Sequence, residues 1–383
     1  MRHLGFASAI LAIIATCPPA NAEIKVGVVV SLSGNGASLG VPYGQGVAAG
    51  AAYSSKVGNE TVRIIQLDDN SDPSAAARAT RKLIEEEGVD VIIGTATAPS
   101  TAAMAAVANE LRVPMLGISP IPPAKPGADV WAADVPPPAP LMISAVTDRM
   151  KRDGRKQVGF IGYSDSWGDF VYNTAKKAAD TGAFTLLTNE RYSRTDTSVT
   201  GQTLKIIAAK PDSVLLGGSG SQAALPSLAL RERGFKGPLY GTPAMLNADF
   251  LKLAGKSAEG MVVSAGPFIV AEQLPDTHYA KKLGLDYRDI FKKANGVAVS
   301  DAFSAYSYDA WLIFLDAAKR IESKNLKPGT SEYRLALRDA IFSTTDFPGT
   351  QGIYTFKPGN VYGADERSLI IVRLVNGAWK FEP

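Results

Sequence analysis

The sequence predicts an α/β protein with two lobes, each built on a mostly parallel sheet flanked by helices. The chain has 383 residues, which is long for a single hydrophobic core. Short β-branched runs alternate with helical stretches at the spacing of parallel strands and their crossover helices. A proline-rich segment, Val135–Pro140, interrupts this alternation, which then begins again. These observations favour two domains of the same class.

Composition is that of an ordinary globular protein, with 46% apolar and 20% charged residues. The net charge is +3, and no block of basic residues stands out. Because a nucleic-acid-binding protein needs a clustered basic footprint, we expect no nucleic-acid partner.

Residues 1–22 are typical of a signal peptide. Leu4–Thr16 is an apolar run too short to span a bilayer, and Ala20-Asn21-Ala22 fits the small-x-small cleavage rule. We therefore expect cleavage between Ala22 and Glu23 and an exported, soluble protein. The alternative is a lipoprotein beginning at Cys17, although Thr16 stands where a smaller residue is preferred. Cys17 is the only cysteine, so cleavage at Glu23 would leave no disulfide or thiolate site.

The first lobe is predicted to begin with a buried strand, Ile24–Ser31, whose valines suit a strand covered on both faces. A polar glycine loop, Ser31–Gly40, follows at the carboxyl end of this strand, where ligands bind in open α/β sheets. The next elements of this lobe are helices at about 41–56, 73–87 and 99–111 and strands at 62–68, 89–94 and 113–119. Asp72 and Pro73 fit the N-cap and first turn of the second helix.

The second lobe repeats the pattern after the proline segment. We predict strands at 158–163, 184–189, 213–217, 239–242 and 260–264, and helices at 168–180, 200–209, 223–233 and about 247–253. Gly266–Pro275 is the second crossing, followed by helices at 278–294, 301–322 and 331–343, with Asp301 and Ser331 as caps. Phe347–Gly352 is the third crossing, before second-lobe strands at 353–356 and 369–374. The predicted lobes are therefore residues 23–135 with 267–349, and residues 136–266 with 350–383.

Several motifs, in order along the chain, resemble the leucine/isoleucine/valine-type solute-binding proteins of bacterial ABC transporters. They include I-K-V-G-V-V-V-S-L-S-G-N-G-A-S-L-G at Ile24–Gly40, L-D-D-N-S-D-P at Leu67–Pro73, L-G-I-S-P at Leu116–Pro120, S-W-G at Ser166–Gly168, and A-E-G at Ala258–Gly260. The resemblance covers the whole chain after the leader. It implies a type I periplasmic binding fold, a clamshell with three crossings that closes on a small solute and delivers it to a membrane permease. It also implies a monomer without a cofactor.

The start of the helix near Pro99 is a candidate carboxylate site. Unpaired N–H groups and the helix dipole favour an anion there, and Thr97 and Ser100 add hydroxyl groups. The alternative is that these residues only cap their own helix. In the resemblance, the ligand-binding serine of the family falls on Ala98, so this side-chain contact is lost or moved to Thr97 or Ser100.

Other family positions carry unusual residues here. Ile121 belongs to the second loop at the strand ends, and Pro123 stands where amino-acid binders carry a threonine; proline supplies neither hydroxyl nor N–H. Leu39 makes one wall aliphatic, and Ser219 replaces a frequent tyrosine. Trp167 matches an aromatic wall, with packing near the hinge as its alternative role.

The stretch Gly241–Met245 holds no acidic residue. Amino-acid binders of the family place a glutamate about here to pair with the ligand ammonium, and a charge closed away from water needs such a partner. Pro243 therefore argues against an ordinary α-amino acid, unless Asp165 or another residue substitutes. Tyr306 and Phe303, at the start of the long helix, are further candidates to reach the cleft or to pack in the core.

Enzymatic readings find little support in the sequence. Gly34, Gly36 and Gly40 do not have the spacing of a dinucleotide loop. No G-x-S-x-G or H-E-x-x-H occurs, and His278 is the only histidine after the leader. The acids of Asp68–Asp72 fit no metal loop, so we expect neither metal nor cofactor.

We therefore predict a periplasmic solute-binding component of an ABC importer. The leading ligand class is an aromatic acid, such as a benzoate or phenylpropenoate, because Ala265–Pro267, Gln273–Asp276 and Gly349–Ile353 resemble the branch of the family linked to such acids. The alternatives are a branched-chain or other amino acid, and a sensor subunit that uses the same cleft.

Overall fold

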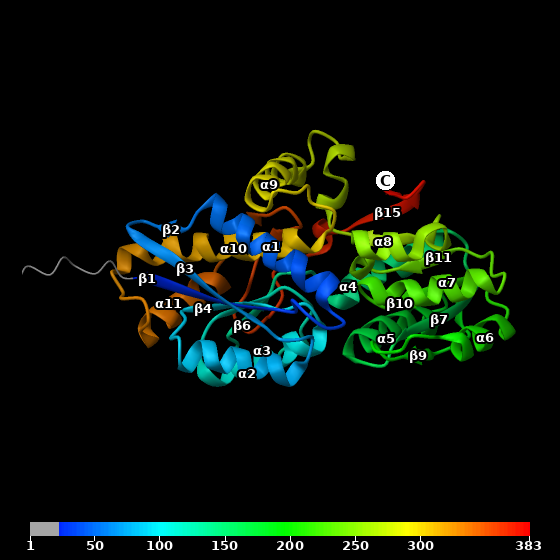
Figure 1. Ribbon diagram of the computed structural model, residues 1–383, viewed down its shortest axis with the longest axis horizontal. Helices are drawn as coiled ribbons and strands as arrows, with labels where there is room; N and C mark the ends of the chain where they lie inside the picture. The colour runs from blue at the N-terminus through cyan, green and yellow to red at the C-terminus, as the bar shows by residue number, and fades with distance from the viewer. Residues whose placement is uncertain (1–22) are drawn as a thin grey trace, which may run out of the picture.

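The computed structural model describes residues 23–383, so the predicted signal peptide and Cys17 lie outside the described residues. Two separate sheets, each with helices on both sides, lie side by side along the long axis of the molecule (Figure 1). This arrangement confirms the predicted fold class.

The first sheet has the strand order β2-β3-β1-β4-β5-β6 and is parallel except for the β2–β3 pair. Its strands are β1 (Glu23–Val30), β2 (Lys56–Val57), β3 (Glu60–Asp68), β4 (Val91–Gly94), β5 (Met115–Gly117) and β6 (Ala132–Asp134). Its helices are α1 (Ala37–Tyr53), α2 (Pro73–Glu85), α3 (Ala98–Leu111), α9 (Tyr279–Asn295), α10 (Phe303–Ile321) and α11 (Ser331–Phe342). We call this sheet and these helices the first lobe.

The second sheet has the order β16-β15-β12-β11-β10-β7-β8, with β9 also paired to β7, and only β15 and β16 run antiparallel to their neighbours. Its strands are β7 (Gln157–Tyr163), β8 (Thr185–Leu186), β9 (Glu190–Tyr192), β10 (Ser213–Gly217), β11 (Leu239–Gly241), β12 (Val262–Ala265), β15 (Ile370–Val375) and β16 (Ala378–Glu382). Its helices are α4 (Ala139–Arg152), α5 (Ser166–Asp180), α6 (Thr200–Ala208), α7 (Ala224–Glu232) and α8 (Ala248–Ala254). These elements form the second lobe.

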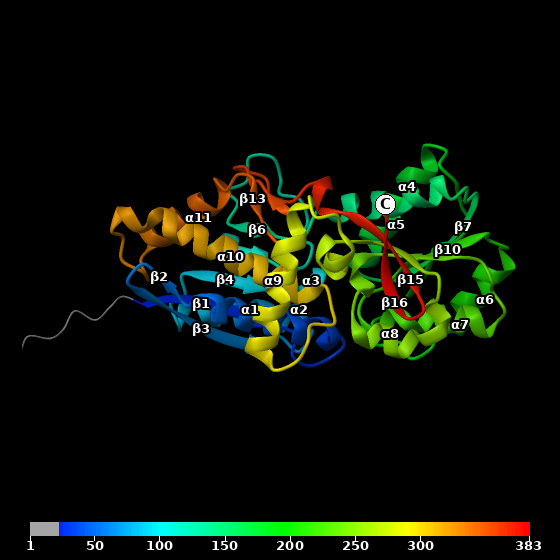
Figure 2. The same cartoon turned by 90° about the horizontal axis from the view of Figure 1, so that it is seen from above.

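The helices cover both faces of each sheet, as continuous buried strands require. In the first lobe α1 and α10 pack together on one face and α2 and α3 on the other, while α9 lies outside α1 (Figures 1 and 2). The central strand β1 is buried along most of its length, which explains its run of valines. The Asp72 carboxylate accepts a hydrogen bond from Ala75 N, which confirms the predicted cap of α2.

The end of the chain differs from the sequence prediction. The strand expected at 353–356 is β14 (Ile353–Tyr354), which pairs with β13 (Phe347–Pro348) instead of joining the second sheet. Tyr354 and Phe356 pack in the core of the first lobe. The buried carboxylate of Asp309 fixes this segment, because it accepts hydrogen bonds from Thr350 N, Gln351 N and Tyr354 Oη. The third crossing into the second lobe therefore comes after Ala364, and not at residues 347–352 as the sequence predicted.

Candidate functional site

A cavity lies between the two lobes, at the carboxyl ends of their parallel strands. Its volume is about 50 Å³. Its walls are Leu39, Tyr43, Ala96, Thr97, Ala98, Ser119, Pro120, Phe303 and Tyr306 from the first lobe, and Pro136, Met142, Trp167, Arg194, Ser219, Pro243 and Ala244 from the hinge and the second lobe. A concave, mostly apolar lining with a few polar groups is typical of a small-molecule site.

The start of α3 forms part of the first-lobe wall, but its hydroxyl groups serve the helix. Thr97 is the N-cap: its Oγ1 accepts a hydrogen bond from Ser100 N and donates one to Ser100 Oγ. Ser100 is fully buried and does not reach the cavity. Both side chains therefore take part in capping their own helix, and only Thr97 also lines the cavity. Pro99 has no N–H, which leaves Ala98 N as the donor that this helix start can offer.

A buried carboxylate holds the segment before α3 in place. Asp69 is fully buried, and its two oxygens accept hydrogen bonds from Ser31 Oγ and Thr95 Oγ1, each at 2.6 Å. Ser71 N donates to the same carboxylate at 2.8 Å. A buried carboxylate that accepts several hydrogen bonds holds its donors in fixed positions. Asp69 therefore fixes the ends of the strands that lead to Ala96–Ala98 in the cavity wall.

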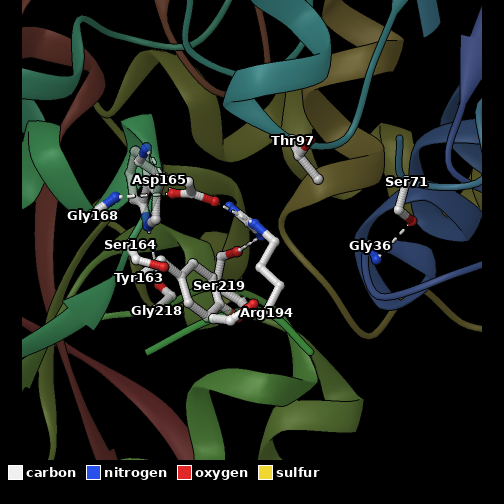
Figure 3. Close-up of polar contacts among 12 residues, drawn as sticks. Gly36, Ser71, Thr97, Tyr163, Ser164, Asp165, Gly168, Arg194, Gly218 and Ser219 are labelled. Atoms are coloured by element: carbon white, nitrogen blue, oxygen red, sulfur yellow. Dashed lines mark hydrogen bonds and ion pairs between the residues drawn. The ribbon is translucent and has the colours of Figure 1, made fainter. Parts of the chain in front are cut away.

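Among the described residues, Arg194 is the only charged side chain that lines the cavity, and three groups of the second lobe hold it. Its Nε donates to Asp165 Oδ2 at 2.6 Å and its Nη1 to Ser219 Oγ at 2.8 Å, so the two acceptors flank the guanidinium (Figure 3). The guanidinium carbon also lies 4.2 Å from the centroid of the Tyr163 ring. Within residues 23–383, Nη2 makes no hydrogen bond, so the guanidinium can still donate to an anion.

Asp165 is committed to neighbours inside the protein. Its Oδ1 caps α5 by accepting hydrogen bonds from Trp167 N and Gly168 N, while Oδ2 accepts a hydrogen bond from Arg194 Nε. Asp165 is not part of the cavity wall. It is therefore not placed to pair with a ligand ammonium, which was the alternative that the sequence left open.

Aromatic rings form a large part of the remaining wall. The indole of Trp167 is buried, and its Nε1 donates to Gly218 O at 3.1 Å, which fixes the ring. Tyr43 and Phe303 lie opposite from the first lobe, with ring centroids 5.7 Å apart. Such faces favour a flat, apolar ligand body.

The two lobes touch at the edge of this cavity. Ser221 N donates to Ser38 Oγ at 3.1 Å, and Ala302 N donates to Leu246 O at 2.9 Å. Gly220 precedes the first contact with φ at +60°, and a Cβ built there would lie 2.6 Å from Ser38 Oγ. Glycine is therefore required at this point, both for its backbone conformation and for the approach of the lobes.

Seven of the ten sequence-predicted site residues line the cavity: Leu39, Thr97, Ala98, Trp167, Ser219, Pro243 and Tyr306. Besides Ser100, two others do not. Ile121 is buried beside the cavity, where its N–H donates to Asp134 and its carbonyl accepts from Tyr362 Oη. Pro123 is exposed on the loop that follows. The glycine loop at 31–40 is also not a ligand cradle, because Gly36 N donates to Ser71 Oγ, away from Arg194 (Figure 3).

Sequence reasoning missed Arg194, the residue with the strongest chemistry in the cavity. It lies two positions after the end of β9. A correctly predicted end of this strand would therefore have pointed to Arg194 as a site residue. The predicted strand at 184–189 is shorter in the structure: β8 covers only Thr185–Leu186, and β9 begins after the predicted range. Thr188 causes the break, because its hydroxyl group bonds both the N–H and the carbonyl of Phe160 on the neighbouring strand.

Among residues 23–383, His, Cys, Asp and Glu side chains form no group of three that could hold a metal ion. In the same part of the chain, no helix has both the length and the apolar character needed to cross a bilayer.

Comparison with known proteins identifies the class of this fold and cavity. Residues 23–378 match the family described as periplasmic binding protein, and the chain belongs to it. Members of this family bind solutes and are not enzymes. A curated relative, Leu/Ile/Val-binding protein homolog 3 of Brucella melitensis, is 23% identical over 67% of this chain and 68% of its own length.

Among solved structures, an extracellular ligand-binding receptor from Rhodopseudomonas palustris HaA2 is 38% identical, with a TM-score of 0.88 over 94% of this chain and 100% of its own. A leucine-binding protein LivK from Thermotoga maritima shares the fold at 21% identity and a TM-score of 0.78, covering 94% of this chain and 98% of its own. A Rhodopseudomonas palustris solute-binding protein in complex with benzoate also has a TM-score of 0.78, at 20% identity, covering 94% and 95%.

Proposed function

We propose that this protein is the periplasmic binding component of an ABC importer and captures a small aromatic carboxylate by closure of its two lobes. The signal peptide would be removed near Ala22, and the closed form would deliver the ligand to an inner-membrane permease. We further propose that the moving units are residues 23–135 with 279–364, and residues 136–278 with 365–383. The first group supplies one buried core, and the second group supplies nearly all of the other.

The observation that carries the proposal is the charge of the cavity wall. Arg194 lines it, and no aspartate or glutamate of residues 23–383 does. A carboxylate closed away from water needs a cation or several donors, which Arg194, Ser219 and Ala98 N supply together. An α-amino acid brings an ammonium group as well, for which the wall offers no acidic partner. The wall thus favours an acid without an amino group.

The aromatic part of the proposal rests on Trp167, Tyr43 and Phe303, whose faces suit a flat ring. Proteins of this fold have been solved with both ligand classes. The Rhodopseudomonas palustris protein described above holds benzoate, and LivJ from Streptococcus pneumoniae, 18% identical to this chain, holds isoleucine. A branched-chain amino acid is therefore the second candidate, and the same cleft would also serve a sensor subunit.

Thermal unfolding of the purified protein with single ligands tests the proposal. Benzoate or 4-hydroxycinnamate should raise the melting temperature at concentrations where leucine and isoleucine leave it unchanged, because only a ligand of the folded state stabilises it. Stabilisation by leucine, without any response to aromatic acids, would contradict the ligand assignment.

A further inference from the structure

In the described chain, the groups that hold Arg194 at the cavity all belong to the second lobe. Asp165 and Ser219 accept its hydrogen bonds, and the centroid of the Tyr163 ring lies 4.2 Å from the guanidinium carbon. Figure 3 shows these side chains as one group, with Thr97 of the first lobe apart from it. Because none of these contacts crosses between the lobes, the group does not depend on closure of the cleft.

Tyr163 connects the two polar residues of this group that line the cavity. It ends β7 and is 1% exposed, and its Oη donates a hydrogen bond to the carbonyl oxygen of Ser219 at 2.7 Å. The same ring lies against the guanidinium of Arg194, a favourable contact for a cation. Tyr163 itself does not line the cavity. One buried side chain therefore sets the position of both groups that can bind a carboxylate.

The first-lobe wall of the cavity has a different character. In the described chain it includes no charged side chain, and the rings of Tyr43 and Phe303 pair there with their centroids 5.7 Å apart. The hydroxyl group of Thr97 is engaged in the cap of α3. A carboxylate that enters an open cleft therefore finds its cation on the second lobe, whereas the first lobe offers mainly ring and aliphatic surface.

The loop that carries Ser219 leads directly to a contact between the lobes. Two residues further on, Ser221 N donates a hydrogen bond to Ser38 Oγ of the first lobe. Ser38 is next to Leu39, which lines the cavity. An acid bound at Ser219 thus lies beside the point at which the first lobe meets the second.

We propose that Tyr163 is the positioning residue of a carboxylate clamp, made of Arg194 and Ser219, which the second lobe assembles before closure. The acid docks on this clamp while the cleft is open, and the first lobe then closes over it with its aromatic wall and Ala98 N. A preassembled clamp lowers the cost of ordering these side chains on binding. The inference rests on the proposed function in one respect, that the ligand carries a carboxylate.

Stopped-flow tryptophan fluorescence of the exported protein, purified free of ligand, separates the two steps. The probe is benzoate or 4-hydroxycinnamate, whichever stabilises the protein more, with leucine as a separate arm. A contact made before closure affects the association rate constant. A contact made only in the closed form affects the dissociation rate constant, because the lobes must open before the ligand leaves.

Variants of the clamp should slow association. Arg194→Lys should lower the association rate constant about 10- to 100-fold and Tyr163→Phe about three- to tenfold, as expected for loss of a charged and of a neutral hydrogen bond. Both should leave the dissociation rate constant within about twofold of the wild type.

Variants of the first-lobe wall should have the opposite effect. Phe303→Leu and Leu39→Ala remove apolar surface that the ligand meets only after closure. Each should raise the dissociation rate constant about three- to tenfold and leave association nearly unchanged. Melting curves show which variants fold, and Leu39→Ala decides the point alone if Phe303→Leu does not fold.

Tyr240→Phe is the matched control for Tyr163→Phe. Tyr240 is also buried in the core of the second lobe, and its Oη donates to Asp153 Oδ2 at 2.6 Å, outside the cavity. Its loss should lower stability and change neither rate constant. In a Ser219→Ala background the effect of Tyr163→Phe on association should fall below about twofold, because Tyr163 acts through that loop. A merely structural tyrosine would give the same loss in both backgrounds.

The other outcomes separate this inference from the proposed function. First-lobe variants that slow association as much as Arg194→Lys would show capture by the first lobe, and unchanged association in Tyr163→Phe would remove its positioning role. Either result leaves the aromatic-acid proposal standing. If leucine binds and the aromatic acids do not, the proposed ligand is wrong, and the same variants decide the order of capture with leucine. Absence of binding in every arm would overturn both.

Discussion

Arg194 and Asp165 form an ion pair in the second lobe, with Nε of the arginine 2.6 Å from Oδ2 of the aspartate. The pair is only partly exposed, and the aspartate also caps α5. The aspartate thus fixes the direction of the guanidinium, while the arginine faces the cavity. The same pair engages the carboxylate of Asp165, which is therefore not free to bind an ammonium group.

Replacing Arg194 by lysine should weaken binding of the aromatic acid about 10- to 100-fold. Lysine keeps the positive charge but lacks the planar guanidinium, which can donate to Asp165, Ser219 and the ligand at the same time. Hydrogen bonds to charged groups contribute more free energy than those between neutral groups. Calorimetry measures the change in Kd. Arg191→Lys is the control, because Arg191 pairs with Asp169 and stacks on Phe160 outside the cavity. Unchanged affinity in Arg194→Lys would place the carboxylate elsewhere.

Ligand binding should change the tryptophan fluorescence, and Trp167 should be the source. Of the four tryptophans, it alone lines the cavity. Trp167→Phe should abolish the signal and weaken binding about tenfold, through loss of ring area and of the hydrogen bond to Gly218 O. Trp379→Phe should retain the signal. A ligand-dependent change that survives in Trp167→Phe would contradict this assignment.

Gly220→Ala should weaken ligand binding by obstructing closure. The added Cβ meets Ser38 of the opposite lobe, so the closed form is penalised more than an open one. Gly182→Ala is the control, since Gly182 also has positive φ but a Cβ there meets no atom within 4 Å. Both variants should lose about 1 kcal/mol of stability in urea unfolding. Only Gly220→Ala should also lose affinity, and equal affinities in the two variants would refute a role in closure.

Asp301 should make stability fall as the pH rises from about 4 to 6. Burial raises the pKa of its carboxyl to about 6, whereas in the unfolded chain it ionises near its usual value of about 4. Between these values the folded state binds more protons, so the free energy of unfolding decreases by up to about 1.4 kcal/mol per pH unit from this group, and is constant above and below.

The comparison with Asp301→Asn isolates this effect. The amide oxygen can still accept the hydrogen bond from Ser304 N, and Asp309 titrates equally in both proteins. Urea unfolding at pH 4, 5, 6 and 7 should show the wild type losing stability relative to the variant between pH 4 and 6. A constant difference would show that Asp301 ionises normally in the folded protein.

Most strands and helices of the fold follow from local patterns in the sequence. The valine run of β1, the Asp72 cap and the proline interruption are each visible as a pattern of neighbouring residues. The predictions of strands and crossings failed where contacts between residues distant in sequence determine the local structure. Tyr354 packs in the first core because Asp309, distant in sequence, binds its hydroxyl group. β14 therefore pairs with β13, which its own residues did not indicate.

The same distinction applies to the site. Trp167 and Pro243 were selected by their resemblance to family positions, and both line the cavity. Arg194 was missed because Thr188 interrupts the preceding strand by bonding to Phe160, a contact that local pattern does not reveal. Ser100 and Ile121 were included wrongly because position near a strand end does not say which way a residue faces. Both are turned inward by hydrogen bonds to Thr97 and Asp134.

The contacts of Ser38 with Ser221 and of Ala302 with Leu246 bear on the rate at which a ligand can leave. Both lie between the lobes and involve main-chain groups that no ligand needs to touch. A molecule enclosed by both lobes departs only after these bonds have broken. Opening of the two lobes then limits the rate of dissociation, so ligands of unequal affinity can have similar residence times.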